Sequence, residues 1–181
     1  MILGCERKEL YVAAETIITL WKEVRRGLVS EVEKIPADQF SFRATPETRS
    51  ITELLQHIVE SQQLLVGETC RDDTNLKRQS FAEHSKEYSP GVKEVLDKES
   101  LLDLLQRSML AAEETIASYC EKLDQSMYRF DGKPTTKNDF LTFAVSHEMY
   151  HRGQLTVYER LLHIEPVLTG RLKRLLGDSP A

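Results

Sequence analysis

The sequence predicts an all-helical fold, a bundle of four helices with a long connection between the second and the third. Apolar residues recur at three- and four-residue steps in four separate stretches of the 181-residue chain, which is the period of a helix with one buried face. Proline, glycine and helix-capping residues separate these stretches. No stretch shows the alternation typical of a strand, so we expect none.

Length and composition favour one soluble domain that spans residues 1–181. The chain is 40% hydrophobic and 29% charged, with a mean hydropathy of -0.40. These values are typical of a globular protein that buries a core without disulfides. No run of 18 apolar residues and no signal-peptide pattern is present, so we expect neither membrane insertion nor secretion.

The charge and the cysteines restrict partners and location. A net charge of -5 and a pI near 5.6 argue against nucleic acid as a partner, because phosphate backbones attract clustered lysine and arginine. Cys5, Cys70 and Cys120 have no CxxC spacing, which argues against a disulfide framework and a cysteine zinc site. We therefore expect a cytoplasmic protein.

The first two helices are predicted over residues 6–34 and 50–70. In the second, Ser50 and Glu53 form the S-x-x-E pattern of a capping box before a new apolar run. The stripe of the first helix consists of Ile17, Leu20, Trp21, Val24 and Leu28.

Residues 71–99 are polar, weakly periodic and much longer than an ordinary connection between antiparallel neighbours. A crossover of this length lets the third helix run parallel to the second, which predicts an up-down-down-up bundle. A short extra helix could lie within the crossover.

The third and fourth helices are predicted over residues 100–123 and 136–163, joined by a turn at Asp131-Gly132-Lys133-Pro134. Thr136 is expected to cap the fourth helix. After Pro166 and Gly170, residues 171–176 form a basic tail that is expected to be helical.

Two histidines and a glutamine occupy core positions of the fourth helix. His147 and His151 are four residues apart, so both imidazoles lie on one side of the helix, where one metal ion can bridge them. The inward seam, at alternating four- and three-residue steps, is Phe140, Ala144, His147, His151, Gln154, Tyr158 and Leu161.

A third imidazole is expected from the second helix, where His57 shares an inward stripe with Leu54, Ser61 and Leu64. A single such histidine is more often an ordinary core or surface residue, but the joint placement of three favours a ligand set for one divalent ion. Three protein ligands leave coordination positions open, as in catalytic sites. His84 and His163 are expected to be solvated.

Three polar residues near these ligands could take part in catalysis. Glu60 and Glu148 could orient a ligand or transfer a proton, although an exposed carboxylate explains each equally well. Gln154 could hydrogen-bond a ligand or a substrate. Gly153 is expected to permit close helix contact, and Arg152 to point outward.

Residues 147–151 also spell HExxH, the zinc-peptidase pattern. The extended form requires glycine at 154 and histidine at 157, where this chain has Gln154 and Val157, so the peptidase interpretation is disfavoured. A di-iron centre requires two E-x-x-H units and two further glutamates, and only Glu148-x-x-His151 is convincing.

The segment FSFRATPETRSITELLQH, which ends at His57, is followed about ninety residues later by HEMYHRGQ at 147–154. The two segments together, in order and spacing over nearly the whole chain, resemble the DinB/YfiT-like family of damage-inducible bacterial proteins. The resemblance implies the family's four-helix bundle, with His57, His147 and His151 as ligands of zinc, nickel, iron or manganese. It also suggests a homodimer.

Some members of that family transfer a thiol such as bacillithiol or mycothiol, and some are thiol-dependent isomerases. By this resemblance we expect a metal-dependent enzyme, in the first place a low-molecular-weight-thiol S-transferase whose partners are a small thiol and an electrophile. A metal-dependent hydrolase with Glu148 or Glu60 as base is the alternative within enzymes. A non-catalytic, homodimeric metal- or ligand-binding protein is the alternative outside them.

Overall fold

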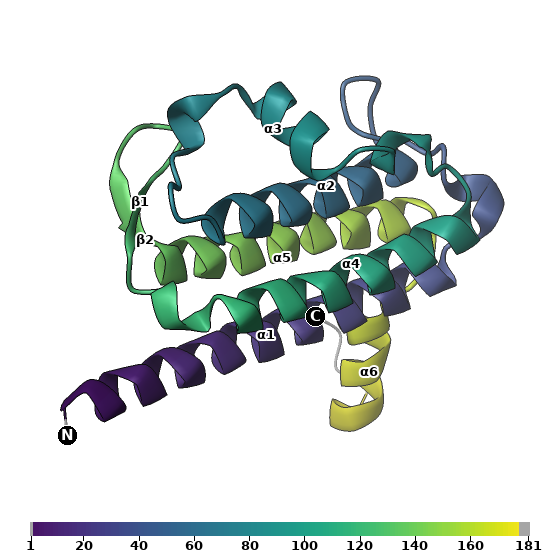
Figure 1. The fold of residues 1–181 in the computed structure, drawn as a ribbon. Coiled ribbons are helices and arrows are strands. Elements are labelled where there is room, and N and C mark those ends of the chain that lie inside the picture. Colours follow the sequence, from purple (N-terminus) through teal and green to yellow (C-terminus); the bar gives the residue numbers. More distant parts are fainter. Residues whose placement is uncertain (1, 178–181) are drawn as a thin grey trace.

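A computed structural model describes residues 2–177, and the side chains of residues 8–177. Four long helices make the bundle (Figure 1): α1 (Ile2–Lys34), α2 (Ile51–Thr69), α4 (Lys98–Ser118) and α5 (Lys137–Leu161). The shorter elements are η1 (Ala37–Gln39), η2 (Leu76–Arg78), α3 (Phe81–Tyr88), η3 (Val92–Glu94), η4 (Cys120–Lys122), β1 (Ser126–Tyr128), β2 (Pro134–Thr136) and α6 (Val167–Leu176).

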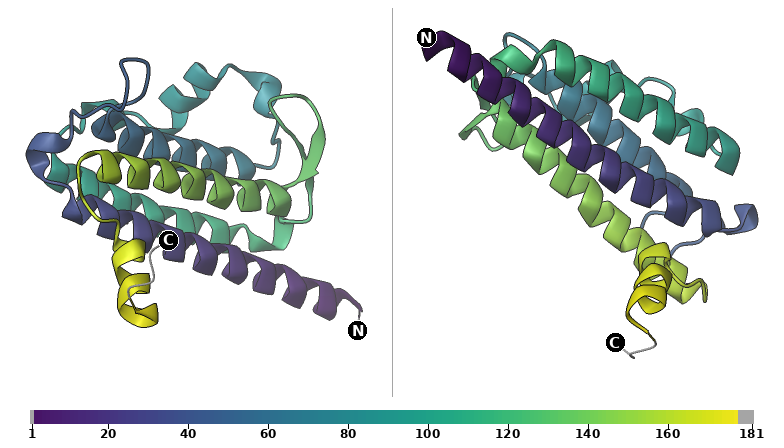
Figure 2. Two further views of the ribbon diagram at one scale, coloured as in Figure 1. Left: turned by 180° about the vertical axis from the view of Figure 1, so that it is seen from behind. Right: turned by 90° about the horizontal axis from the view of Figure 1, so that it is seen from below.

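The topology confirms the predicted up-down-down-up bundle. In Figure 1, α1 and α5 run in one direction and α2 and α4 in the other. Both α1 and α2 pack against α4 and α5, so the two pairs lie on the diagonals of the bundle. Figure 2 shows α1 extending past the other helices at its N-terminal end. None of the helices between residues 2 and 177 combines the length and apolar character of a membrane span.

The helix boundaries follow local capping chemistry. Ser50 and Glu53 form the predicted capping box at the start of α2, and the Thr136 side chain caps α5. The third long helix begins two residues earlier than predicted, because the Asp97 carboxylate accepts a hydrogen bond from the Ser100 backbone N–H. The predicted basic tail is α6, which begins at Val167 rather than at residue 171.

The expectation of no strands was wrong for the connection between α4 and α5. There, β1 and β2 pair antiparallel with Met127 opposite Thr135. The predicted turn lies between them, and Gly132 adopts the positive φ of 78° that favours glycine. Each strand is only three residues long, which is too short to show alternation in the sequence.

The crossover contains the short helix that the sequence allowed, and it corrects the prediction for His84. This side chain, expected to be solvated, is fully buried. Its Nδ1 lies 3.6 Å from the Glu68 carboxylate, and its Nε2 lies 3.2 Å from the carbonyl of Leu76. The crossover therefore folds back onto α2, and a polar sequence still encloses a buried histidine. His163 is exposed, as expected.

The core consists of two apolar clusters, one toward each end of the bundle. Ile17, Trp21, Val24 and Leu28 are buried as predicted. Leu20 and the last residue of the α5 seam, Leu161, are about half exposed and were wrongly assigned to the core. An α-helix has about 3.6 residues per turn, whereas alternating three- and four-residue steps average about 3.5. Residues at the edges of the predicted apolar stripes therefore point away from the core.

A buried polar layer separates the two clusters and joins all four long helices. The guanidinium of Arg25 on α1 donates from Nε and Nη2 to the two Glu148 carboxylate oxygens on α5, at 2.6 and 2.8 Å. It also donates to Gln62 on α2 and Ser108 on α4, at 3.0 and 2.9 Å. The indole Nε1 of Trp21 donates to Glu148 at 2.6 Å. Each of the three guanidinium nitrogen atoms of Arg25 therefore donates at least one hydrogen bond.

A second buried carboxylate attaches α6 to the bundle. Glu31 on α1 accepts a hydrogen bond from the first backbone N–H of α6, at Val167, at 2.6 Å. Glu159 on α5 is fully buried nearby, and neither of its carboxylate oxygens has a hydrogen-bond donor among the described residues. Burial, followed by the charge of Glu31, raises the pKa of Glu159 from 4.5 to about 8.

We predict that Glu148→Ala destabilises the fold by about 3–5 kcal/mol, because it leaves the Arg25 charge buried without its partner. The double variant Arg25→Met/Glu148→Met removes both charges and should cost less than Glu148→Ala alone. Urea unfolding followed by circular dichroism measures both values. A double variant that is less stable than Glu148→Ala would contradict this prediction.

The pH dependence of stability should report on Glu159. Because its pKa is higher in the folded than in the unfolded chain, the folded state binds the proton more tightly, and stability falls as pH rises from 4.5 to about 8. Glu159→Gln mimics the protonated form, so it should flatten this slope and stabilise the protein at pH 8. Thermal melting at several pH values tests this, with the exposed Glu114→Gln as control.

Candidate metal centre

Three histidines converge between α2 and α5, near the middle of the bundle. His57 comes from α2, and His147 and His151 come from successive turns of α5. The two helices are packed neighbours, which brings together residues ninety positions apart in the chain. His151 is buried and the other two are partly buried. The arrangement therefore has one side within the protein and one side open.

The Nε2 atoms of the three rings point toward one another. Those of His57 and His151 are 3.0 Å apart, and those of His151 and His147 are 3.1 Å apart. All three candidate ligand atoms lie within 4.8 Å of one another. The rings meet edge to face, with centroids 4.4 to 5.4 Å apart, so each presents its Nε2 edge to the common centre.

Gln154 sets the orientation of His151. Its side-chain oxygen lies 2.8 Å from His151 Nδ1, and because an amide oxygen only accepts, Nδ1 carries the hydrogen. The Nε2 atom of the neutral ring then presents a lone pair to the centre. Metal-binding histidines usually have such an acceptor on the nitrogen that is not coordinated.

All three imidazoles are held in the neutral form that binds metals. Burial lowers the pKa of His57 to about 3 and of His147 to about 4, and it also lowers the pKa of His151. The positive charge of Arg49 contributes to the lowering of all three pKa values. A metal ion would thus displace no proton from the Nε2 of His151.

These three residues fit one divalent ion. Two nitrogen atoms at about 2.1 Å from a shared ion lie about 3.0 Å apart when the angle between them is about 90°. The two separations that involve His151, 3.0 and 3.1 Å, match this value, and the third pair of ligand atoms lies within 4.8 Å. Without an ion, the lone pair of His151 could accept a hydrogen bond from only one neighbour, although two nitrogen atoms approach it. Nitrogen ligands suit zinc, nickel and iron.

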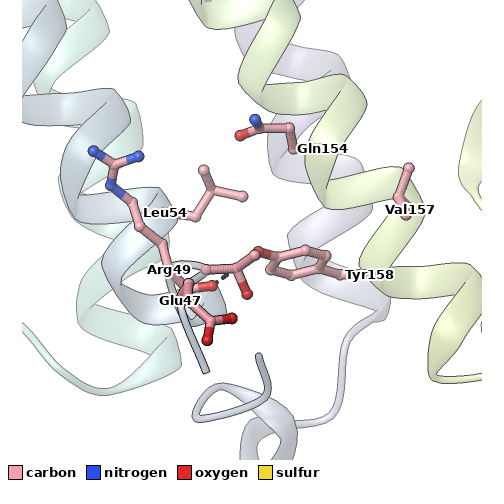
Figure 3. Close-up of a pocket in the computed structure, with 7 residues that line it drawn as sticks. Glu47, Arg49, Leu54, Gln154, Val157 and Tyr158 are labelled. Carbon is pink, nitrogen blue, oxygen red and sulfur yellow. Dashed lines mark hydrogen bonds between the residues drawn. The ribbon is translucent and has the colours of Figure 1, made fainter. Parts of the chain in front are cut away.

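An open cavity of about 530 Å³ lies between the N-terminal end of α2 and the C-terminal half of α5 (Figure 3). Gln154, which contacts His151, lies in its wall. Arg49 also lines it, and the backbone carbonyl of this residue accepts a hydrogen bond from the Tyr158 hydroxyl at 2.9 Å. The full lining is Glu47, Thr48, Arg49, Leu54, Gln154, Val157 and Tyr158. The volume suits a metabolite-sized molecule.

Sequence reasoning did not single out Arg49 as a functional residue. It precedes the Ser50 cap and therefore lies outside the helix whose periodicity was followed. Because Arg49 is not part of a helix, helical periodicity gave no signal for it.

The two carboxylates considered for catalysis do not bond to the imidazoles. Glu148 is buried, and its two oxygens accept hydrogen bonds from Arg25 and Trp21 instead. Glu60 is also largely buried, with its carboxylate 3.8 Å from the Lys93 ammonium group. Both carboxylates are therefore buried, whereas the sequence was equally compatible with exposed ones.

Two expectations for the segment 152–153 were wrong. Arg152 does not point into solvent, because its guanidinium packs across Gly27 of α1 and lies 3.5 Å from Glu31. Gly153 permits no close helix contact, since a side chain added there would meet nothing within 4 Å. Gly27 on α1 instead leaves room for the Arg152 side chain to pack closely.

Comparison with known proteins places the chain in a family. A model of the DinB family matches residues 9–174, more than nine-tenths of the sequence. The chain belongs to the DinB family. No curated protein matches it in a sequence comparison.

Two solved structures share this DinB-family fold. One is a DinB-like protein from Bacillus cereus ATCC 10987, with a TM-score of 0.64 and 19% identity over 84% of this chain and 94% of that chain. The other is a DinB-like protein from Bacillus subtilis, with a TM-score of 0.50 and 22% identity over 82% of this chain and 92% of that chain. At these identities, the comparison supports the fold alone.

We predict that Gln154→Ala weakens metal binding about tenfold to a hundredfold, because His151 loses the acceptor that fixes its ring. The global fold should be unchanged, since Gln154 lies at the wall of an open cavity. Competition with a chromophoric chelator measures the affinity. The exposed Gln106→Ala on α4 serves as the control and should bind metal like the parent. Equal affinity in all three proteins would contradict the role of Gln154.

Proposed function

We propose that this DinB-family protein is a divalent-metal-dependent enzyme that transfers a small thiol to an electrophilic substrate. The observation that carries the proposal is the convergence of three imidazole Nε2 atoms beside an open cavity. Structural metal sites usually close with four protein ligands, whereas catalytic sites keep a position open for water or substrate. Three ligands next to a metabolite-sized cavity favour the second kind.

His57, His147 and His151 would hold the ion. A bound zinc, nickel, iron or manganese ion would supply positive charge that stabilises the thiolate form of a coordinating thiol at neutral pH. The protein's own groups keep the imidazoles neutral, and Gln154 holds the His151 ring in place. Leu54 and Tyr158 exclude water from part of the cavity.

In the proposed reaction, the thiol sulfur forms a bond to an electrophilic carbon of the substrate. The leaving group departs with its bonding electrons, and the thiol proton is released to solvent. No oxidant or reductant is required.

The thiol is proposed to come from a separate molecule. Burial raises the pKa of the Cys70 thiol to about 11, which keeps it protonated, and Cys120 is almost fully buried. Both are free cysteines, which supports the further proposal of a reducing, cytoplasmic location. The acidic surface supports a small-molecule partner rather than nucleic acid or an anionic membrane.

The hydrolase alternative requires a base near the site. Glu148 is engaged with Arg25 and Trp21, and Glu60 faces Lys93, so neither carboxylate is placed against the imidazoles. These contacts favour the transferase. A non-catalytic, homodimeric metal-binding protein would retain the ligands but would need neither the cavity nor the exchangeable positions.

The first test is metal content. Tag-free parent protein reconstituted with zinc or nickel should retain about one ion per chain after desalting, and its melting temperature should rise with the ion. The His57→Ala/His147→Ala/His151→Ala variant should retain none while keeping its helical spectrum. His163→Ala, at an exposed position, should behave like the parent. Equal metal in the triple variant would refute the site.

The second test is activity of the metal-loaded protein on a chromogenic aryl halide. Turnover that requires added thiol and disappears in the triple variant supports the transferase. Thiol-independent cleavage of an ester would instead support the hydrolase. Metal binding without either activity would support the non-catalytic alternative.

A further inference from the structure

Two arginines of the loop that precedes α2, Arg43 and Arg49, differ in the partners of their side chains. Arg43 and Glu53 form an ion pair at 2.5 Å, and the Glu47 carboxylate is bonded within its own turn to Thr45. The guanidinium of Arg49 makes neither a hydrogen bond nor an ion pair with any side chain described between residues 8 and 177. The Arg49 charge helps to lower the pKa of the nearby Glu53 carboxyl, but the ion pair of Glu53 is with Arg43.

The backbone of this arginine is fixed while its side chain is free. The Tyr158 hydroxyl donates to the Arg49 carbonyl at 2.9 Å, and the Tyr158 ring packs edge to face against Phe42 with centroids 5.8 Å apart. Figure 3 shows Arg49 and Gln154 on either side of Leu54, with the Glu47 carboxylate pointing away from the guanidinium. Arg49 thus presents an unpaired charge along the wall of the cavity.

The cavity approaches the histidine cluster at Gln154. Gln154 lies in its wall and bonds to His151, and the charge of Arg49 is close enough to affect all three imidazoles. A molecule that fills this space can therefore contact the site at one end and the guanidinium at another.

We propose that Arg49 binds a carboxylate of the small molecule that occupies this cavity, so that the protein selects anionic thiols over neutral ones. The inference rests on the proposed thiol chemistry and adds the class of substrate. The planar guanidinium matches a carboxylate with two parallel hydrogen bonds. Arg49 is a specificity-determining residue, and the ligands and Gln154 remain in place without it.

The experiment measures thiol binding to cobalt-loaded protein, through the absorption band that appears when a thiolate binds cobalt. Three thiols of similar size differ in their second group: mercaptopropionate carries a carboxylate, mercaptoethanol a hydroxyl and cysteamine an ammonium. The parent should bind mercaptopropionate about tenfold more tightly than mercaptoethanol, and cysteamine most weakly. The preference should shrink at high salt, because the guanidinium is exposed.

Arg49→Gln should lose the tenfold preference while its affinity for mercaptoethanol and its cobalt content stay within about twofold. Arg49→Lys keeps the charge without the planar fork and should retain part of the preference. Arg43→Gln is the matched control, since it removes an arginine from the same loop that is already paired with Glu53. It should keep the parent's order of thiols.

The outcomes separate this inference from the function on which it rests. A carboxylate preference that disappears in Arg49→Gln and persists in Arg43→Gln supports it. Equal binding of the three thiols, or a preference that survives in Arg49→Gln, overturns it and leaves the thiol chemistry standing. A cobalt-loaded parent that binds none of the thiols overturns the proposed function, and this inference with it.

Discussion

The buried pair of Arg25 and Glu148 is the constraint on which the bundle depends. A charge taken from water into a helical core is costly unless its partners are complete, and here one guanidinium reaches groups on all three other long helices. The buried apolar side chains of α5 and this ion pair together fix the rotation of the helix. The carboxylate of Glu148 allows one rotation, and its neighbours His147 and His151 then lie toward α2.

This constraint also separates the HExxH segment of this chain from the arrangement of a zinc peptidase. In that pattern the glutamate is expected beside the metal, because it activates water. Residue 148 lies about 100° around the helix from 147, and in this bundle that direction leads to α1. The HExxH segment therefore places two candidate metal ligands on one face of α5 and a buried, ion-paired carboxylate on another.

Much of the fold and of the site could be predicted from local patterns. Helical periodicity and the Ser50–Glu53 box located α2, and the joint placement of His57, His147 and His151 indicated their convergence. The buried state of His84 could not be predicted, because it depends on how the crossover folds back onto Glu68. The hairpin at residues 126–136 was too short for periodicity, and Arg49 lies where no periodicity applies.

The crossover topology affects the order in which parts of the chain fold. His57 is separated from its two companions by the crossover, α4 and the hairpin, and α5 is the last of the long helices. Closing so long a loop before its contacts form is entropically unfavourable, so the three imidazoles assemble only once most of the chain has folded. An ion held by all three histidines therefore stabilises the finished bundle most, because a partly folded chain offers at most the local pair His147 and His151.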